Sequence, residues 1–176
     1  MGDTGQKCLM ITDGVDFKFF EPKPFCSSWY SHKFRGPGIR YEIGICIATG
    51  FIVSFNGPFK CGAWPDLKIF KSLLKTRLGC GEKVVADRGY KGDLKICHPD
   101  MGTTEQQIAM GQARARHETV NGRIKNWVSM SRVFRHSRDK HHLLFRSVIV
   151  IEQIKMMNGK PAIQVDTVVD PLFAWE

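Results

Sequence analysis

Hydrophobic and polar residues alternate from Cys8 to Phe20, and this period of two predicts a β-strand. The residues expected on one face are Leu9, Ile11, Asp13, Val15, Phe17 and Phe19. Asp13 interrupts that apolar face, where an isolated charge is costly unless it is paired or bound to a metal ion. Asp16 has the opposite parity, so we expect it to be a surface acid.

Two more strands follow a loop that is rich in Pro, Ser and Gly. Residues 39–48 alternate, and residues 51–56 do so after the tight turn Thr49-Gly50, so the pair is expected to form a hairpin. Gly57-Pro58 is expected to end that hairpin. Trp29 and Tyr30 of the loop, together with Trp64, could stack on exposed bases or pack in the core.

The rest of the chain has mainly helical periodicity. Apolar residues recur at helical spacing between Leu67 and Leu78, and Gly79 ends that helix. A short buried strand is expected over residues 82–87, and another around 94–97. Two further helices are expected, from Thr103, with a capping box, to about Trp127, and over residues 138–157.

This order of elements predicts a mixed α/β (α+β) fold. Its core would be a mixed five-stranded sheet with an antiparallel three-strand meander, flanked by helices. That is the ribonuclease-H-like plan, although the order of elements alone also fits other folds.

Composition narrows the class of protein. The 176 residues are 43% hydrophobic, enough for one domain with a core. No apolar run approaches the roughly 18 residues of a membrane span, and the polar start has no apolar signal region, so we expect no membrane association and no secretion. Six single cysteines favour reduced thiols in an intracellular protein. A structural zinc site at Cys61, Cys80, Cys97 and His98 would fit no common ligand spacing.

The net charge of +9 is concentrated in one segment. The basic residues between positions 114 and 140 are Arg114, Arg116, Arg123, Lys125, Arg132, Arg135, Arg138 and Lys140. Only Glu118 and Asp139 oppose these eight, so the segment carries +6 of the total. The total charge alone fits a basic solvated surface as well as a polyanionic partner, either nucleic acid or an anionic membrane surface, and its concentration in one segment favours nucleic acid.

Two acids besides Asp13 are placed to bind a divalent cation. Asp87 follows the buried strand Val84–Ala86, and the carboxyl end of a strand is a favoured ligand position. Glu118 shares one stripe of the predicted helix with Arg114 and Lys125, which lie four residues before it and seven after it. Carboxylates of this kind suit Mg²⁺ or Mn²⁺.

Each of these acids also has a simpler interpretation. Asp87 could initiate a turn, and Glu118 could form a surface ion pair. Asp66 is the alternative second acid, but after Pro65 it is expected mainly to cap a helix. His117 faces about 100° away from Glu118 and is expected to contact phosphate or fill space rather than act as a base.

Several segments together resemble the catalytic domain of DDE transposases, most closely the Harbinger-type DDE endonucleases. They are Thr12-Asp13-Gly14, Gly57-Pro58-Phe59 with Gly62–Asp66, Ala86–Tyr90, and Arg114 with Glu118 and Lys125. The resemblance spans about Leu9 to Asn158. It departs from the related bacterial signature at Gly111, where that signature has Tyr. It also lacks the usual N-terminal helix-turn-helix region.

The resemblance implies an enzyme that cleaves and transfers DNA phosphodiester bonds. Asp13, Asp87 and Glu118 would hold two Mg²⁺ or Mn²⁺ ions, with Asp66 as the alternative second acid. The phosphate-binding residues would be Arg114, Lys125, Arg116, Arg123, Arg132 and Arg135. Residues 1–8 would be a polar stub, 9–158 the catalytic domain and 159–176 a tail.

The expected partner is double-stranded DNA at transposon ends or targets. A separate DNA-binding subunit and a homo-oligomer are further expectations. The location would be the nucleus in a eukaryote and otherwise the cytoplasm. The alternative is a domesticated or truncated derivative that binds DNA or protein without cutting.

Overall fold

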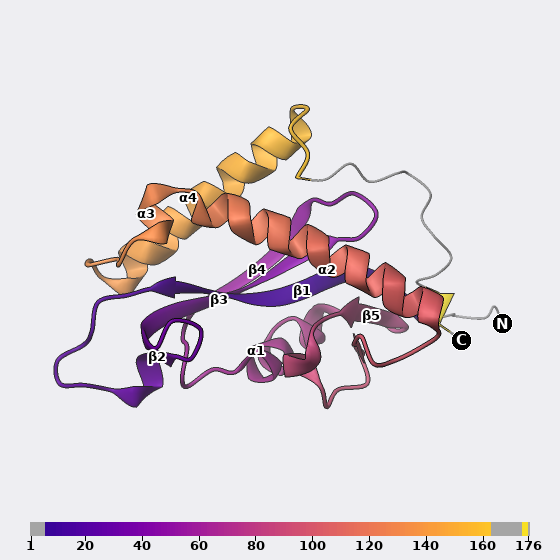
Figure 1. Cartoon of the computed structure of the whole chain (residues 1–176), viewed down its shortest axis with the longest axis horizontal. Coiled ribbons are helices and arrows are strands. Elements are labelled where there is room, and N and C mark those ends of the chain that lie inside the picture. The colour runs from indigo at the N-terminus through magenta and orange to yellow at the C-terminus, as the bar shows by residue number, and fades with distance from the viewer. Residues whose placement is uncertain (1–5, 163–173, 176) are drawn as a thin grey trace.

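The protein consists of a mixed β-sheet with helices on both faces (Figure 1). The structure is a computed structural model, and it describes residues 6–162 and 174–175. The long helices α2 and α4 cover one face, and the short helix α1 lies on the other. This bears out the expected mixed α/β class with an open sheet between helices.

Five strands run across the sheet in the order β4-β3-β1-β5-β6. They are β1 (Gln6–Lys18), β3 (Gly36–Cys46), β4 (Ile52–Lys60), β5 (Glu82–Val85) and β6 (Ile96–Cys97). The first three form an antiparallel meander, as the alternating pattern predicted. β5 is parallel to β1, and β6 is parallel to β5.

The prediction of five strands was wrong, because two short strands add to the sheet. β2 (Tyr30–Ser31) pairs with the start of β3, and β7 (Ala174–Trp175) pairs with the start of β1. Two-residue strands carry too little alternation to be recognised in a sequence. Most of the predicted tail, residues 163–173 and 176, lies outside the described residues.

The helices agree with the predicted ones except at α1, which is shorter, and at α3, which was not predicted. They are α1 (Asp66–Ser72), α2 (Thr104–Lys125), α3 (Val128–Ser131) and α4 (Arg138–Met157), with 3₁₀ turns at Ser27–Trp29, Lys75–Arg77 and Arg88–Tyr90. Thr103 and Gln106 form the expected capping box at the start of α2. α1 stops six residues before Leu78, and the 3₁₀ turn Lys75–Arg77 carries part of the remaining apolar stretch.

Two local irregularities in the strands were not predicted. The register between β1 and β5 shifts between Cys8 and Met10, and Leu9 is 48% exposed although it was expected on the apolar face. In β4 the strand continues through Gly57-Pro58 to Lys60 instead of ending there. A register shift opposite Arg40 and Glu42 accommodates this continuation.

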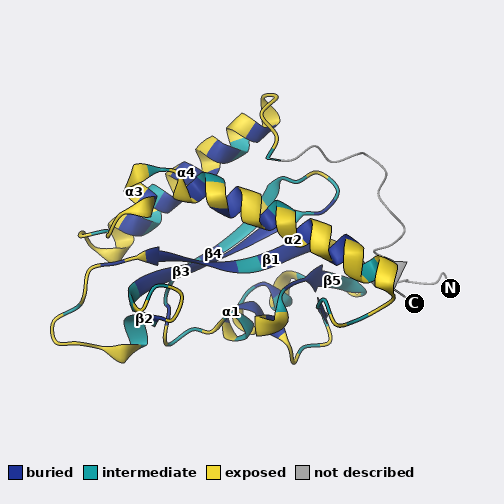
Figure 2. Ribbon diagram, viewed as in Figure 1, coloured by how far each residue is buried: buried dark blue, intermediate teal, exposed yellow. Residues whose placement is uncertain are grey.

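Buried residues form a separate cluster on each face of the sheet (Figure 2). The larger one joins β1 and β3 to α2, α3 and α4, and includes the stacked rings of Tyr41 and Phe145. The smaller one joins β5, β6 and α1 around Phe70 and Tyr90. β1 lies between them, so its alternate side chains face two different environments.

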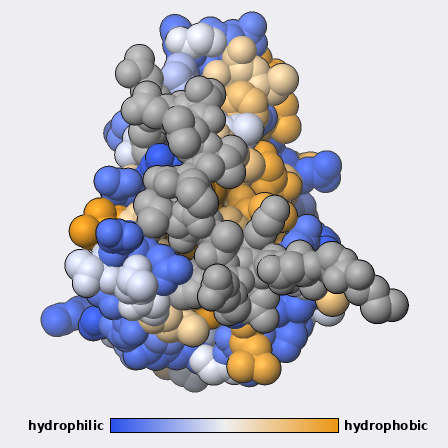
Figure 3. Space-filling model, turned by 90° about the vertical axis from the view of Figure 1, so that its right-hand side faces the viewer, coloured by the Kyte–Doolittle hydropathy of each residue, from blue (hydrophilic) through white to orange (hydrophobic). Residues whose placement is uncertain are grey.

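Some hydrophobic side chains remain on the surface. Val53 of β4 and Val150 and Ile154 of α4 are each more than half exposed and line a shallow apolar groove. A space-filling view shows hydrophobic and hydrophilic surface side by side in the described part of the molecule (Figure 3). Among the described residues, no helix is both long and apolar enough to span a membrane.

Candidate acid pocket

The pairing of β1 with β5 brings Asp13 and Asp87 to one place. Ile11 lies opposite Val85 in the parallel register, and each aspartate is two residues further along its own chain. Side chains two residues apart in extended chain point to the same face. Both carboxylates are therefore directed to the side of the sheet that α2 covers.

A small pocket of about 40 Å³ lies at this point, and we call it the acid pocket. Its lining residues come from β1, from the turn after β5 and from α2. They are Ile11, Thr12, Asp13, Asp87, Arg114, His117 and Glu118. The three acids predicted from the sequence thus line one pocket together with Arg114, although they lie 74 and 31 residues apart.

Asp13 is largely buried and only weakly partnered. Its Oδ1 accepts a hydrogen bond of 2.7 Å from the backbone N–H of Gly14. Burial raises the pKa of Asp13, against the opposing effect of the positive groups nearby. A charged carboxylate at this position is therefore costly unless a cation joins it.

His117 faces Asp13 from α2 and is only 1% exposed. Its Nε2 lies 2.9 Å from the carbonyl oxygen of Ile43, which can only accept, so Nε2 carries the hydrogen. Burial lowers the pKa of His117, and the neutral ring leaves a lone pair on Nδ1. Nδ1 has no hydrogen-bond partner and lies 3.9 Å from Asp13 Oδ2. The two atoms thus face each other beyond direct hydrogen-bond distance.

Asp87 and Glu118 line the pocket in different ways. Asp87 Oδ1 accepts a hydrogen bond of 2.7 Å from Gly89 N–H, which is the expected turn-initiating contact. Glu118 is exposed on α2. Within residues 6–162 and 174–175, no three His, Cys, Asp or Glu side chains converge closely enough to hold a metal ion as they stand.

Asp66, the alternative second acid, lies on the opposite face of β1 from the acid pocket. Its carboxylate packs against Gly14, at the place that a Cβ on that residue would occupy. Asp66 lies in the first turn of α1, one of the two positions predicted for it, but Pro65 takes the N-cap position and Asp66 makes no capping hydrogen bond. Instead its Oδ1 lies 3.2 Å from Arg40 Nη1.

The prediction that Asp16 is a surface acid was also wrong. Asp16 is 5% exposed and receives two hydrogen bonds from Arg40, of 2.7 and 3.0 Å, and one of 2.5 Å from Ser31. Burial raises the pKa of Asp16, but these hydrogen bonds outweigh it and leave the pKa below its ordinary value. Arg40 therefore joins Asp16 and Asp66 in one buried ion network.

Glu42 lies beside this network, opposite Gly14 in the β1–β3 pairing. Asn56 donates a hydrogen bond of 2.8 Å to its Oε2, and Oε1 has no partner. Burial raises the pKa of Glu42 to about 7. The polar character of this face was not predicted, because no local pattern distinguishes a buried acid in a strand from an exposed one.

The predicted phosphate-binding residues fall into two groups. Within residues 6–162, the exposed side chains of Arg114, Lys125, Arg132 and Arg135 make no hydrogen bond or ion pair. Arg116, by contrast, donates to the carbonyl oxygen of Ile47 at 2.8 Å.

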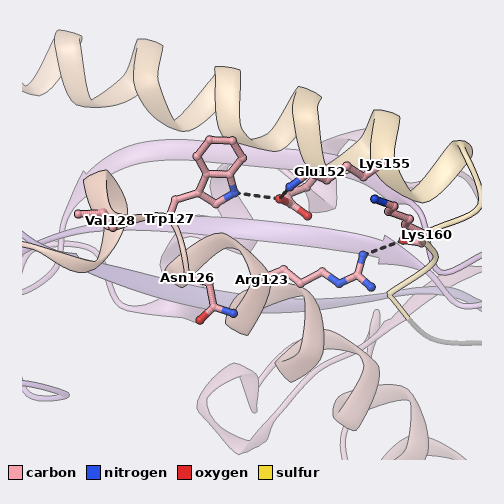
Figure 4. Close-up of a pocket in the computed structure, with 7 residues that line it drawn as sticks. All are labelled: Arg123, Asn126, Trp127, Val128, Glu152, Lys155 and Lys160. Carbon is pink, nitrogen blue, oxygen red and sulfur yellow. Dashed lines mark hydrogen bonds and ion pairs between the residues drawn. The ribbon is translucent and has the colours of Figure 1, made fainter.

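Arg123 belongs to the second group, because it donates to the carbonyl oxygens of Lys160 and Pro161 at 2.7 and 2.6 Å. Figure 4 shows it beside the network in which Trp127 and Lys155 both donate to Glu152 Oε1. These contacts join the ends of α2 and α4. Arg116 and Arg123 therefore already serve the fold, whereas the first group is available to a ligand.

The aromatic residues considered for base stacking have partners within the fold. Trp29 stacks on Phe19 at 5.0 Å between ring centroids, and Trp64 lies 4.9 Å from Phe59. Tyr30 packs edge-on against His32. Core packing, the alternative interpretation, accounts for Trp29.

Comparison with known proteins gives no match: no family model fits the chain, and no curated protein or solved structure is significantly similar to it. Function must therefore be inferred from the acid pocket and its surroundings.

Proposed function

We propose that this protein is a DNA phosphodiesterase of the DDE transposase type, dependent on divalent metal. The observation that carries the proposal is the acid pocket, where Asp13, Asp87 and Glu118 lie beside Arg114. Acids so far apart in sequence meet there because β5 is parallel to β1 and α2 crosses above both. A pocket with hard oxygen donors and an adjacent free cation suits a phosphate ester and its metal ion.

The fold is consistent with this proposal. The five main strands lie in the sheet in the order β4-β3-β1-β5-β6. If these five are numbered by their order in the chain, the order across the sheet is 3-2-1-4-5. An antiparallel meander followed by parallel crossover strands is the plan of the ribonuclease-H-like fold, to which we propose that the protein belongs. In this arrangement the acids lie at the centre of the sheet.

The donor set suits a divalent cation by its chemistry. Asp13 Oδ2 and the unpartnered Nδ1 of His117 lie 3.9 Å apart at the pocket, and both are atoms that can bind a cation. Asp13, Asp87 and Glu118 would hold Mg²⁺ or Mn²⁺, the ions expected from the sequence, once the carboxylates turn from their present backbone partners. Such ions activate an attacking oxygen and stabilise a leaving oxygen.

The chain's own cations would hold the DNA backbone. Along the axis of α2, Arg114 lies about 6 Å and Lys125 about 10 Å from Glu118. Arg132 and Arg135 continue the basic surface beyond the end of that helix. Contacts of this kind to phosphates position DNA without reading its sequence. Double-stranded DNA is therefore the proposed partner.

Nicking of supercoiled DNA with Mg²⁺ tests the proposal. We expect Asp13→Asn and Asp87→Asn each to lower the nicking rate by at least about 100-fold. The matched control is Asp139→Asn, which changes an exposed acid of α4 and should leave the rate unchanged. Equal nicking by the parent and both variants would refute the assignment of these acids.

Metal binding can be measured without catalysis. At a Mg²⁺ or Mn²⁺ concentration ten times its dissociation constant, the ion should raise the free energy of unfolding by about 1.4 kcal/mol. Asp13→Asn should abolish most of this gain, and Asp139→Asn should keep it. Thermal unfolding with and without EDTA gives the comparison.

A second candidate function is a DNA-binding module that does not cut. The exposure of Glu118 and the lack of three converging ligands among the described residues favour it. A parent protein that shifts DNA in a gel but neither nicks it nor gains stability from metal would support this alternative.

A further inference from the structure

Lys33 lies close to Asp13 although it belongs to a different part of the chain. It occupies the turn between β2 and β3, where Ser31 pairs with Gly36. Its side chain is exposed, yet Nζ donates a hydrogen bond of 2.6 Å to the carbonyl oxygen of Gly14. Gly14 follows Asp13 directly, and the charge of Lys33 acts on both Asp13 and His117, although Lys33 itself does not line the acid pocket.

The base of this turn is firmly held. Ser31 is 1% exposed, and its hydroxyl donates to Asp16 while accepting from the backbone N–H of Lys33 at 3.3 Å. Asp16 is in turn fixed by Arg40. The backbone of Lys33 is therefore held in place, through Ser31, by the buried ion network of Asp16 and Arg40.

The ammonium group of Lys33 retains binding capacity. It has three N–H donors, and one is used by Gly14. The other nearby cation, Arg40, is 9% exposed and committed to Asp16 and Asp66. The positive charge of Lys33 also acts on Asp13, where it opposes the effect of burial on the pKa. Lys33 is thus an exposed cation within electrostatic reach of the pocket.

We propose that Lys33 binds a backbone phosphate of DNA at the acid pocket and positions the strand there together with Arg114. This inference rests on the proposed function for the identity of its ligand. A phosphodiester placed over Asp13 and Asp87 would meet Arg114 from α2 and Lys33 from the β2–β3 turn. Lys33 acts as a positioning residue, because it supplies charge and hydrogen bonds but takes no part in the transfer itself.

The test is a salt titration of DNA binding by fluorescence anisotropy, in EDTA, with a short duplex. Lys33→Met should weaken binding about tenfold and reduce the slope of log K against log salt by about one. Lys33→Arg should retain the parent slope. The matched control is Lys23→Met, which removes an exposed lysine from the same connection between β1 and β3 and should change the slope less.

A purely structural role would give a different result. Lys33→Met would then lower the melting temperature and leave the salt slope unchanged, and this outcome would overturn the inference. The inference would also be overturned if Lys33→Met and Lys23→Met had the same slope of log K against log salt. If the parent does not nick DNA but Lys33→Met still loses one unit of slope, the catalytic proposal fails while the phosphate contact stands. If the parent nicks DNA, Lys33→Met should raise KM more than it lowers kcat.

Discussion

Asp13 and Asp16, three residues apart on β1, differ in their partners and in the direction in which their pKa values are shifted. Asp16 is held by Arg40 and Ser31, and its pKa lies below the ordinary value. Asp13, on the other face, has one backbone partner, and burial raises its pKa. The difference in parity places one acid in a closed ion network and the other in an open pocket.

This contrast separates a structural charge from an available one. An acid that has gained all its partners stabilises the fold and has little capacity for a ligand. An acid that is desolvated without such partners costs stability, and a ligand can recover that cost. Asp13 belongs to the second kind, which is why the acid pocket rather than the buried network is the candidate site.

The largest expected effect comes from breaking the closed network. Arg40→Met should leave Asp16 buried without its main partner and lower the free energy of unfolding by about 3–5 kcal/mol. Arg135→Met, which changes an exposed arginine without a partner, should alter it by less than about 0.5 kcal/mol. Urea denaturation of both variants measures the difference. A loss below about 1 kcal/mol for Arg40→Met would mean that the network contributes little.

A smaller effect is expected from the residue between the two faces. Gly14→Ala would put a Cβ where the Asp66 carboxylate lies, and the forced shift should cost about 1–3 kcal/mol. Gly111→Ala is the matched control, because it meets no atom within 4 Å and should stabilise α2 by up to about 1 kcal/mol. Thermal unfolding reports both changes, and equal behaviour of the two variants would contradict the close approach of Asp66.

The smallest expected effect is the pH dependence of the free energy of unfolding, which should have opposite signs for Asp16 and Asp13. Urea denaturation in EDTA measures it. The lowered pKa of Asp16 gives stability above its ordinary value of 3.8, and that stability disappears as the pH falls through and below this value. The raised pKa of Asp13 has the opposite consequence, so its cost disappears as the pH falls toward 3.8 from above.

Asp16→Asn should therefore be destabilising at pH 7 and less so at pH 3. Asp13→Asn should be stabilising or neutral at pH 7, with any gain gone near pH 4. The same sign for both variants at pH 7 would show that the two acids are not in contrasting environments.

Periodicity alone predicted much of the fold. The three-strand meander and the bounds of α4 follow from repeating patterns of hydrophobic and polar residues, and the capped start of α2 follows from the local motif of Thr103 and Gln106. The short strands β2 and β7 lack such a pattern. The continuation of β4 through Gly57-Pro58 depends on a register shift opposite β3, which no local signal reveals.

The candidate site was predicted only in part, because local patterns do not show which partners a side chain has on distant strands. Asp13 could be recognised because it interrupts an apolar face, whereas Asp16 was misjudged because its partner Arg40 lies 24 residues away on another strand. Lys33 gave no signal beyond its charge. Its contact with Gly14 exists only because the β2–β3 turn folds back along β1.

The two residues before Glu118 limit how α2 can move. Arg116 donates a hydrogen bond to the carbonyl oxygen of Ile47, and His117 bonds to that of Ile43. Both carbonyl groups belong to β3 or to the residue directly after it. Rolling the helix about its axis would break both bonds at once. Glu118 therefore lies on a turn of α2 that these two bonds fix against β3, and its long side chain supplies whatever reach it has into the acid pocket.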